Sequence, residues 1–174
     1  MALKSAASRI AVALLTLSGA GLTGIAIHEG FRGEAYQPTS GDRWTIGFGS
    51  TEGVRPGDRI DPVAALARKQ REISRDYESA VKRCVKVPMH QHEFDAMVDT
   101  TYNIGPSAFC SSTMVKRLNE GDYRGACEAL LLWRMYTDHS TGIRHDCSKP
   151  ESKRICGGLW DRRQRARAMC LGEL

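Results

Sequence analysis

The sequence contains no motif of a zinc-binding or nucleic-acid-binding protein, although basic residues are in excess. Its 174 residues include 25 Lys and Arg against 20 Asp and Glu, a formal charge of +5 at neutral pH. Such a charge attracts an anionic partner, which could be nucleic acid, a membrane surface or a cell-wall polymer. The Cys and His residues do not have zinc-finger spacing, and no RNA-binding signature is present. We therefore expect no metal site and no nucleic-acid partner.

Cysteine is absent before residue 84, and none of the later cysteines forms a C-x-x-C pair. The six are Cys84, Cys110, Cys127, Cys147, Cys156 and Cys170. An even number without metal-ligand spacing indicates disulfides and an oxidising compartment, although some could be small buried hydrophobic residues instead. The pairing cannot be read from the sequence, but the short polar loop between Cys147 and Cys156 favours that pair.

Charge is also absent from residues 10–27, an apolar run that follows Lys4 and Arg9. Its length is at the lower limit for a helix that spans a bilayer. We favour a weak signal-anchor, with the basic end in the cytoplasm and the rest of the chain exported. A cleaved export signal with a small-residue site at 18–20 is the second interpretation. A buried helix of a cytosolic protein is the third, and it agrees less well with disulfides.

The rest of the chain predicts an α+β fold with a small β-hairpin lobe and a larger helical lobe joined by a long helix. Residues 34–60 are rich in turn-forming residues and indicate hairpins. Asp61 and Pro62 are typical of a helix start, and a helix of about 25 residues follows. Further helices are expected at 90–104, 107–119, 122–135 and 158–171, with 136–156 irregular. We divide the chain into a segment 1–27 and a catalytic domain 28–174, without internal repeats.

The residues that could carry chemistry lie between Glu29 and Thr45. Glu29 follows an apolar helix, and apolar neighbours disfavour a charged carboxyl, so Glu29 could hold a proton and act as an acid. The segment 44–51 predicts a strand with large side chains on one face. Thr45, Gly47 and Gly49 would then line the other face, as a groove open to a ligand.

Asp42 lies in the turn before this strand, near the same groove. Two carboxyls and a hydroxyl suit the hydrolysis of a glycosidic bond, with one acid, one base and one group that places water. If Asp42 is only a turn residue, another base would be needed.

These motifs resemble the phage lysozyme family of glycoside hydrolases, the muramidase endolysins. The resemblance starts with E-G-x-x-x-x-x-Y at Glu29 to Tyr36 and W-T-I-G-x-G-x-T at 44–51, and it continues with Y-N-x-G at 102–105. Further matches are F…S-T at 109–113, N-x-G-D at 119–122 and L-x-x-R-R at 159–163. The resemblance implies Glu, Asp and Thr as the catalytic set, no cofactor, and a lysozyme-like fold.

The sequence departs from the family at one catalytic position. Pro38 occupies the usual place of the Asp, and we assign the base to Asp42 because it lies within reach of Thr45. The resemblance also implies that Arg162 or Arg163 approaches Glu29. As substrate contacts we expect Tyr36, Gly47, Gly49, Asn103 and Arg162.

The implied function is an endolysin that cleaves the β-1,4 bond between N-acetylmuramic acid and N-acetylglucosamine. Family members with an uncleaved signal-anchor are exported, held at the host inner membrane and later released, and residues 10–27 resemble that segment. We expect a monomer whose partners are peptidoglycan strands and, through residues 10–27, the host membrane. The alternatives are a lytic transglycosylase of the same fold and a non-catalytic basic protein that binds walls or disrupts membranes.

Overall fold

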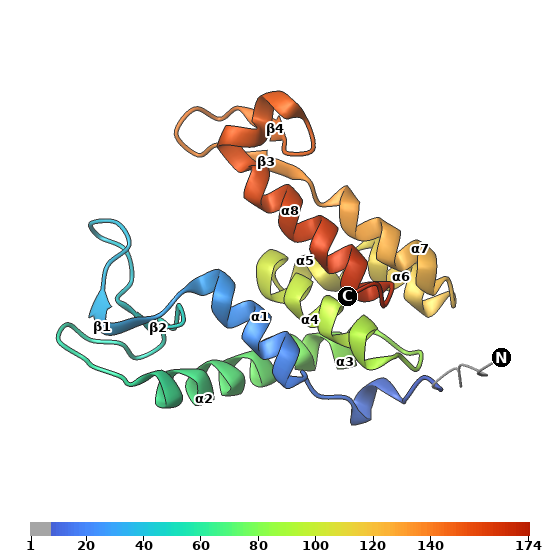
Figure 1. Cartoon of the computed structure of the whole chain (residues 1–174), viewed down its shortest axis with the longest axis horizontal. Helices are drawn as coiled ribbons and strands as arrows, with labels where there is room; N and C mark the ends of the chain where they lie inside the picture. Colours follow the sequence, from blue (N-terminus) through green and yellow to red (C-terminus); the bar gives the residue numbers. More distant parts are fainter. Residues whose placement is uncertain (1–7) are drawn as a thin grey trace. The chain divides into compact units, whose positions relative to one another are not determined.

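The computed structural model describes residues 8–174, and Lys4 lies outside this range. The chain forms two compact units (Figure 1). One consists of residues 16–79 and is called here the 16–79 unit. The other consists of residues 80–174 together with the N-terminal residues up to Leu15, and is called the 80–174 unit. Helices dominate and two small antiparallel hairpins accompany them, so the α+β prediction is confirmed.

The elements of the 16–79 unit, in chain order, are α1 (Gly19–Glu29), β1 (Arg32–Tyr36), β2 (Thr45–Gly47), α2 (Pro62–Glu72) and the π-helical segment η2 (Ile73–Glu78). Helix α1 begins because the Ser18 hydroxyl accepts a hydrogen bond from the Gly21 N–H at 3.0 Å. Ile25, Ile46 and Ile73 are buried and contribute to the apolar interior of this unit.

Strands β1 and β2 pair antiparallel, with Arg32 opposite Gly47 and Tyr36 opposite Thr45. The predicted strand 44–51 is wrong in its extent, because β2 ends at Gly47, whose φ is 65°. The chain then turns tightly, and the backbones of Ile46 and Ser50 hydrogen-bond each other in both directions. All three residues of β2 are buried, so the predicted alternation of faces does not hold.

The long helix begins as predicted at Asp61, whose carboxylate accepts hydrogen bonds from the N–H groups of Val63 and Ala64. Helical structure continues through α2, η2 and α3 (Ser79–Cys84). The boundary between the two units falls within this helical run, after Ser79.

Residues 10–27 do not form one continuous helix. A short 3-10 turn, η1 (Val12–Leu14), is followed by extended chain and then by α1. Val12, Leu15, Leu22 and Ile25 are buried in the folded chain. Among residues 8–174, no helix has both the length and the apolar character needed to cross a membrane. The division at residue 27 stays a prediction.

The elements of the 80–174 unit after α3 are α4 (Gln91–Ile104), α5 (Pro106–Cys110), α6 (Thr113–Asn119), α7 (Tyr123–Ala129), η3 (Leu130–Leu132), β3 (Met135–Thr137), β4 (Arg144–Asp146), η4 (Pro150–Ser152) and α8 (Lys153–Cys170). Helix α4 starts at a capping box formed by His90 and Glu93 and ends before Gly105, whose φ is 88°. Helix α8 packs on α4, and Phe94, Met97 and Leu118 are fully buried in this unit.

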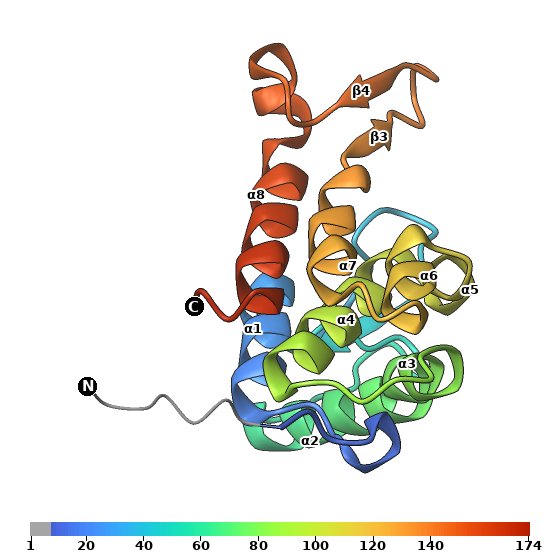
Figure 2. The same ribbon diagram turned by 90° about the vertical axis from the view of Figure 1, so that its right-hand side faces the viewer.

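Four predictions for this unit need correction. The expected helix 122–135 is too long, since α7 ends at Ala129 and η3 at Leu132, and the last helix begins at Lys153 and not near residue 158. The expected helix 107–119 is divided into α5 and α6, because Ser112 leaves the helical conformation and caps α6. The segment 136–156 is not irregular throughout, since β3 and β4 form a hairpin with Met135 opposite Asp146 (Figure 2). Both strands are short and largely exposed, which explains the weak sequence signal.

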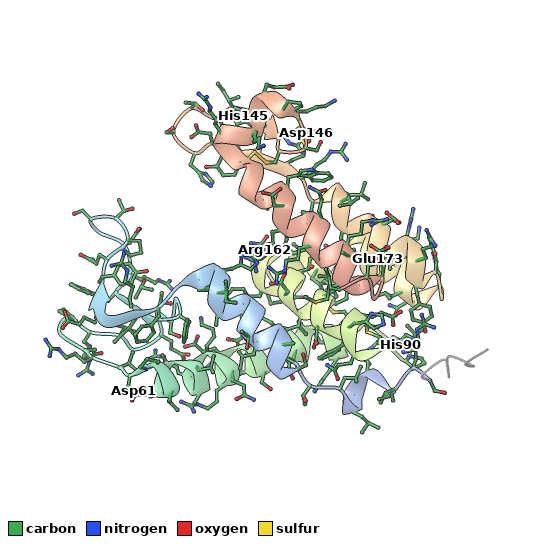
Figure 3. The ribbon with its side chains drawn as sticks, viewed as in Figure 1. Asp61, His90, His145, Asp146, Arg162 and Glu173 are labelled. Atoms are coloured by element: carbon green, nitrogen blue, oxygen red, sulfur yellow. A yellow bond between two sulfur atoms is a disulfide. The ribbon has the colours of Figure 1, made fainter. Side chains whose placement is uncertain are left out.

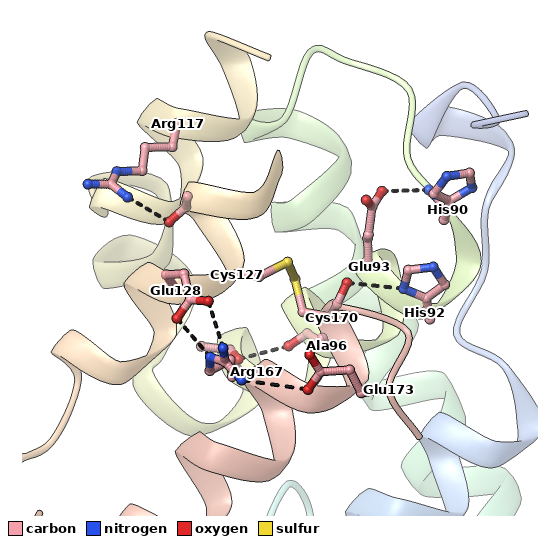
Figure 4. Close-up of a disulfide and its surroundings, with 12 residues drawn as sticks. His90, His92, Glu93, Ala96, Arg117, Cys127, Glu128, Arg167, Cys170 and Glu173 are labelled. Atoms are coloured by element: carbon pink, nitrogen blue, oxygen red, sulfur yellow. Dashed lines mark hydrogen bonds and ion pairs between the residues drawn. A yellow bond between two sulfur atoms is a disulfide. The ribbon is translucent and has the colours of Figure 1, made fainter. Parts of the chain in front are cut away.

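All six cysteines form disulfides, and all three bonds lie in the 80–174 unit. They are Cys84–Cys110, Cys127–Cys170 and Cys147–Cys156. The predicted Cys147–Cys156 pair is therefore confirmed. Next to the second bond, Arg167 of α8 makes two hydrogen bonds of 2.7 Å to the Glu128 carboxylate of α7 (Figure 4). A covalent bond and a bidentate ion pair thus join α7 to α8.

Candidate active site

Glu29 is the last residue of α1, and the helix ends there because Gly30 adopts a φ of 70°. Ile25 and Ala26 are buried one turn earlier, whereas His28 and Glu29 are exposed. Glu29 is thus exposed at the end of an apolar helix, and the predicted effect of apolar neighbours on its carboxyl stays a prediction. Helix geometry places the carboxyl at the point where the chain enters β1.

The turn after β2 contacts Glu29 directly. A Cβ atom added to Gly49 would lie 2.6 Å from Oε2 of Glu29, so any other residue at this position would displace the carboxyl from its present place. The φ of Gly49 is 74°, which also favours glycine. Beside this contact, the rings of Phe31 and Phe48 lie 5.4 Å apart. The W-T-I-G-x-G segment and Glu29 are thus joined within one unit.

Close packing against α2 requires a glycine at position 47. A Cβ atom at this position would lie 2.9 Å from Cβ of Ala65, and the φ of Gly47 is 65°. The sequence predicted that both glycines clear space for a ligand. In the structure, Ala65 approaches Gly47 and Glu29 approaches Gly49. A contact of either glycine with substrate stays a prediction.

Thr45 begins β2 opposite Tyr36 and is only 6% exposed. Its hydroxyl donates a hydrogen bond of 3.1 Å to the carbonyl oxygen of Arg43. Because a hydroxyl has one proton and two lone pairs, the Thr45 oxygen can still accept a hydrogen bond from another molecule. The Arg32 guanidinium lies 5.5 Å from the centre of the Tyr36 ring.

Asp42 is exposed in the turn between β1 and β2. Its N–H donates to the carbonyl of Thr39 at 3.0 Å, and its carbonyl accepts a 2.7 Å hydrogen bond from the side chain of Gln37. The turn is thus held through the backbone of Asp42. Within residues 16–79, no hydrogen bond or ion pair engages the carboxylate of Asp42 or of Glu29. Both carboxylates therefore have free acceptor capacity in this unit.

The predicted Arg162 and Asn103 lie in the 80–174 unit. Arg162, labelled in Figure 3, projects from α8. It donates a 2.7 Å hydrogen bond to Asp99 of α4, and both side chains are largely buried. Arg163 donates to the Trp133 carbonyl at 2.9 Å and also to the side-chain oxygen of Asn103. Burial lowers the pKa of Arg163 to about 10, so the group is still protonated at neutral pH. An approach of Arg162 or Arg163 to Glu29 stays a prediction.

Each of these two arginines also has a spare donor. In the part of the chain that the structure describes, Nε of Arg162 and Nη1 of Arg163 are buried without a hydrogen-bond partner. Buried donors normally find a partner, so these two atoms are exceptions in the described part of the chain. No three His, Cys, Asp or Glu side chains among residues 8–174 are grouped so as to hold a metal ion.

Sequence reasoning missed a buried polar cluster behind the turn at Gly49. Ser50 and Lys69 are each 2% exposed, and both contact the Glu72 carboxylate. Tyr77 lies on the following helical turn. Burial raises the pKa of Tyr77, and the negative charges of nearby carboxylates, Glu29 among them, raise it further. The only available signal was a pair of charged residues three positions apart in a helix, which is common on solvated surfaces.

Comparison with known proteins supports the same assignment. The sequence profile of the phage lysozyme family matches residues 26–165. An endolysin of Acyrthosiphon pisum secondary endosymbiont phage 1 is 38% identical over 117 residues, which are 67% of this chain and 79% of that protein. A SAR-endolysin of Escherichia phage N15 is 32% identical over 179 residues, covering 96% of this chain and 97% of the relative.

A solved structure, the muramidase domain of SpmX from Asticaccaulis excentricus, has a TM-score of 0.76 and 30% identity, with 90% of this chain and 98% of that chain covered. The family match over residues 26–165 extends into both units and includes residues 29–49. The chain therefore belongs to the phage lysozyme family, and it is an endolysin with the lysozyme-like fold and glycosidase character of that family.

Proposed function

We propose that this endolysin hydrolyses the β-1,4 bond between N-acetylmuramic acid and N-acetylglucosamine in peptidoglycan. The observation that carries the proposal is the contact between the Glu29 carboxyl and Gly49. It joins the candidate acid to the segment that also carries Thr45. No hydrogen bond within the unit occupies the carboxyl, which leaves it available to a glycosidic oxygen.

In the proposed reaction Glu29 donates its proton to the leaving oxygen as the bond between this oxygen and the anomeric carbon breaks. A water molecule attacks the anomeric carbon from the opposite face and gives a proton to Asp42. Thr45 accepts a hydrogen bond from this water, because its own proton is directed to Arg43. The anomeric configuration inverts, which requires a carboxyl separation of roughly 6.5–9.5 Å when substrate is bound.

Several further residues are proposed to contact the glycan. Tyr36 offers an aromatic face opposite Thr45 in the hairpin. The backbones of Gly47 and Gly49 can approach a sugar closely. Arg162 has the spare Nε donor described above, and Asn103 is exposed on α4.

We also propose that the enzyme is exported to the periplasm as a monomer and is first held at the host inner membrane by residues 10–27. Its likeness to the SAR-endolysin of phage N15 over nearly the whole chain supports this. The folded chain would then be the released form. In it Arg9 makes hydrogen bonds of 2.7 and 3.1 Å to Glu93, and the backbone of Ile10 pairs with that of Met89. Fractionation of expressing cells would test the tether, and soluble protein at every stage would contradict it.

Replacement of Glu29 by Gln is the principal test of catalysis. The amide keeps the shape of the side chain but cannot donate a carboxyl proton, so release of reducing ends from purified peptidoglycan should fall at least 100-fold. Glu34→Gln is the matched control, because Glu34 is exposed and pairs only with exposed Arg59 within its unit. Undiminished lysis by Glu29→Gln would favour the non-catalytic basic protein.

Asp42→Asn separates hydrolysis from the transglycosylase alternative. A lytic transglycosylase needs no base to activate water, so its rate would not depend on Asp42. We expect a loss of about 100-fold and products with free reducing ends in mass spectra. Products with 1,6-anhydro ends would reject the hydrolytic mechanism.

A further inference from the structure

The turn at residues 47–50 supports the carboxyl of Glu29. Gly49 contacts Oε2 of Glu29, and Phe48 packs on Phe31, two residues beyond Glu29 in the chain. A small displacement of this turn would therefore move the carboxyl or open a gap behind it. Because catalytic groups act only within a narrow range of geometry, whatever fixes the turn also affects catalysis.

Ser50 holds the turn in two ways. Its backbone exchanges hydrogen bonds of 2.9 and 3.0 Å with Ile46, which closes the turn on β2. Its hydroxyl donates a hydrogen bond of 2.9 Å to Oε2 of Glu72. Ser50 is only 2% exposed and the Glu72 side chain 17%, so this second bond is partly shielded from solvent, which strengthens it.

Glu72 is itself fixed by two cations of α2. Nζ of Lys69 lies 3.0 Å from Oε2, and Nε of Arg68 lies 3.1 Å from Oε1. Burial by itself raises the pKa of Glu72, but the hydrogen bond and charge of Lys69, with Ser50 and Arg68, outweigh burial and lower it. The carboxylate is therefore ionised at neutral pH and offers Ser50 a fixed, charged acceptor.

We propose that Ser50 and Glu72 are positioning residues for Glu29. Glu72 holds the Ser50 hydroxyl, Ser50 holds the turn, and Gly49 of this turn sets the position of the Glu29 carboxyl. Neither residue touches the substrate in this account. The proposal rests on the proposed role of Glu29 as the catalytic acid.

The experiment measures kcat and KM for Ser50→Ala, Ser50→Thr and the wild-type protein on purified glycan strands. Loss of the hydroxyl should lower kcat about tenfold, which corresponds to about 1.4 kcal/mol, and leave KM within about twofold. Ser50→Thr keeps a hydroxyl and should recover most of kcat. Ser74→Ala is the matched control, since the Ser74 hydroxyl also donates to a helix carboxylate, at 3.4 Å to Glu78. It should leave both constants unchanged.

The proposal would be overturned if Ser50→Ala and Ser74→Ala lowered kcat equally. It would also be overturned if Ser50→Ala left kcat unchanged and only lowered the melting temperature, since Ser50 would then have a structural role. If Ser50→Ala does not fold, Glu72→Gln gives the same test, because it keeps an acceptor for Ser50 but removes the charge. The role of Glu29 as the catalytic acid is tested separately, by comparing the activity of the wild-type protein with that of Glu29→Gln. Failure of the positioning role is thus distinguishable from failure of the proposed function.

Discussion

Different interactions stabilise the interior of each of the two units of this endolysin. The 80–174 unit contains all three disulfides, and side-chain ion pairs such as Arg167–Glu128 join its helices. The 16–79 unit has no cysteine and contains the three candidate catalytic residues Glu29, Asp42 and Thr45. Its turns depend on glycines in close contact with neighbouring side chains and on the carboxylate of Glu72, whose side chain is 17% exposed. Covalent bonds thus stabilise one unit, whereas steric fit and hydrogen bonds position groups in the other.

The largest effect on stability is expected from the disulfide between α7 and α8. Replacing both Cys127 and Cys170 by Ala removes a bond with a sequence separation of 43, worth about 4 kcal/mol of unfolding free energy. The same change at Cys147 and Cys156, separated by only 9 positions, should cost about 2.5 kcal/mol. Urea denaturation measures the loss of unfolding free energy in each double variant. Equal losses would show that loop length does not determine the contribution of these bonds.

In the other unit, Gly49→Ala should strongly reduce activity. The added methyl would meet Glu29 Oε2, and we expect kcat to fall about 100-fold, close to 3 kcal/mol. Gly53→Ala is the matched control, because Gly53 has a similar φ of 68° and open space around it. Both variants carry the backbone strain, so the difference in kcat isolates the contact with Glu29. Equal activity of the two variants would contradict the steric argument.

Ion pairs of the two units should also differ in strength. Arg9 pairs with Glu93, whose side chain is only 4% exposed, and Arg9→Ala should lower the unfolding free energy by about 1–2 kcal/mol. Arg75 pairs with Glu52 and Asp76 at the surface, where the side chains are 40–67% exposed, and Arg75→Ala should leave the unfolding free energy almost unchanged. Thermal unfolding of both variants checks the order. A larger loss of unfolding free energy in Arg75→Ala than in Arg9→Ala would contradict the expected order.

The smallest expected effect is a pH dependence due to Glu72. Its pKa in the folded chain lies below the usual value of a glutamate, so the unfolded chain binds the proton more readily. The stabilisation is complete above the unfolded pKa and is lost as pH falls through the folded pKa. Glu72→Gln should reduce this acid-dependent loss in a series of melting curves. An unchanged pH profile in the variant would show that Glu72 makes no such contribution.

Local signals in the sequence predicted much of the fold. The Asp61–Pro62 start of α2, the end of α4 at Gly105 and the Asp122 cap of α7 are confirmed, because a cap forms between residues close in the chain. The extent of β2 was wrong, because the reversal at Gly47 depends on a left-handed backbone conformation and on packing against Ala65. The β3–β4 hairpin was missed because its strands are short and exposed.

The sequence by itself determined the family, the helix boundaries set by local caps, the even set of cysteines and the Glu29 to Thr45 segment. Each of these can be read from residues near one another in the chain or from a family pattern. Only the tertiary structure showed the Cys84–Cys110 and Cys127–Cys170 pairs. It alone also showed that Gly49 lies against Glu29 and that Ser50 donates a hydrogen bond to Glu72. The two residues of each such contact are separated in the chain, so only the packing of the folded protein specifies their distance and burial.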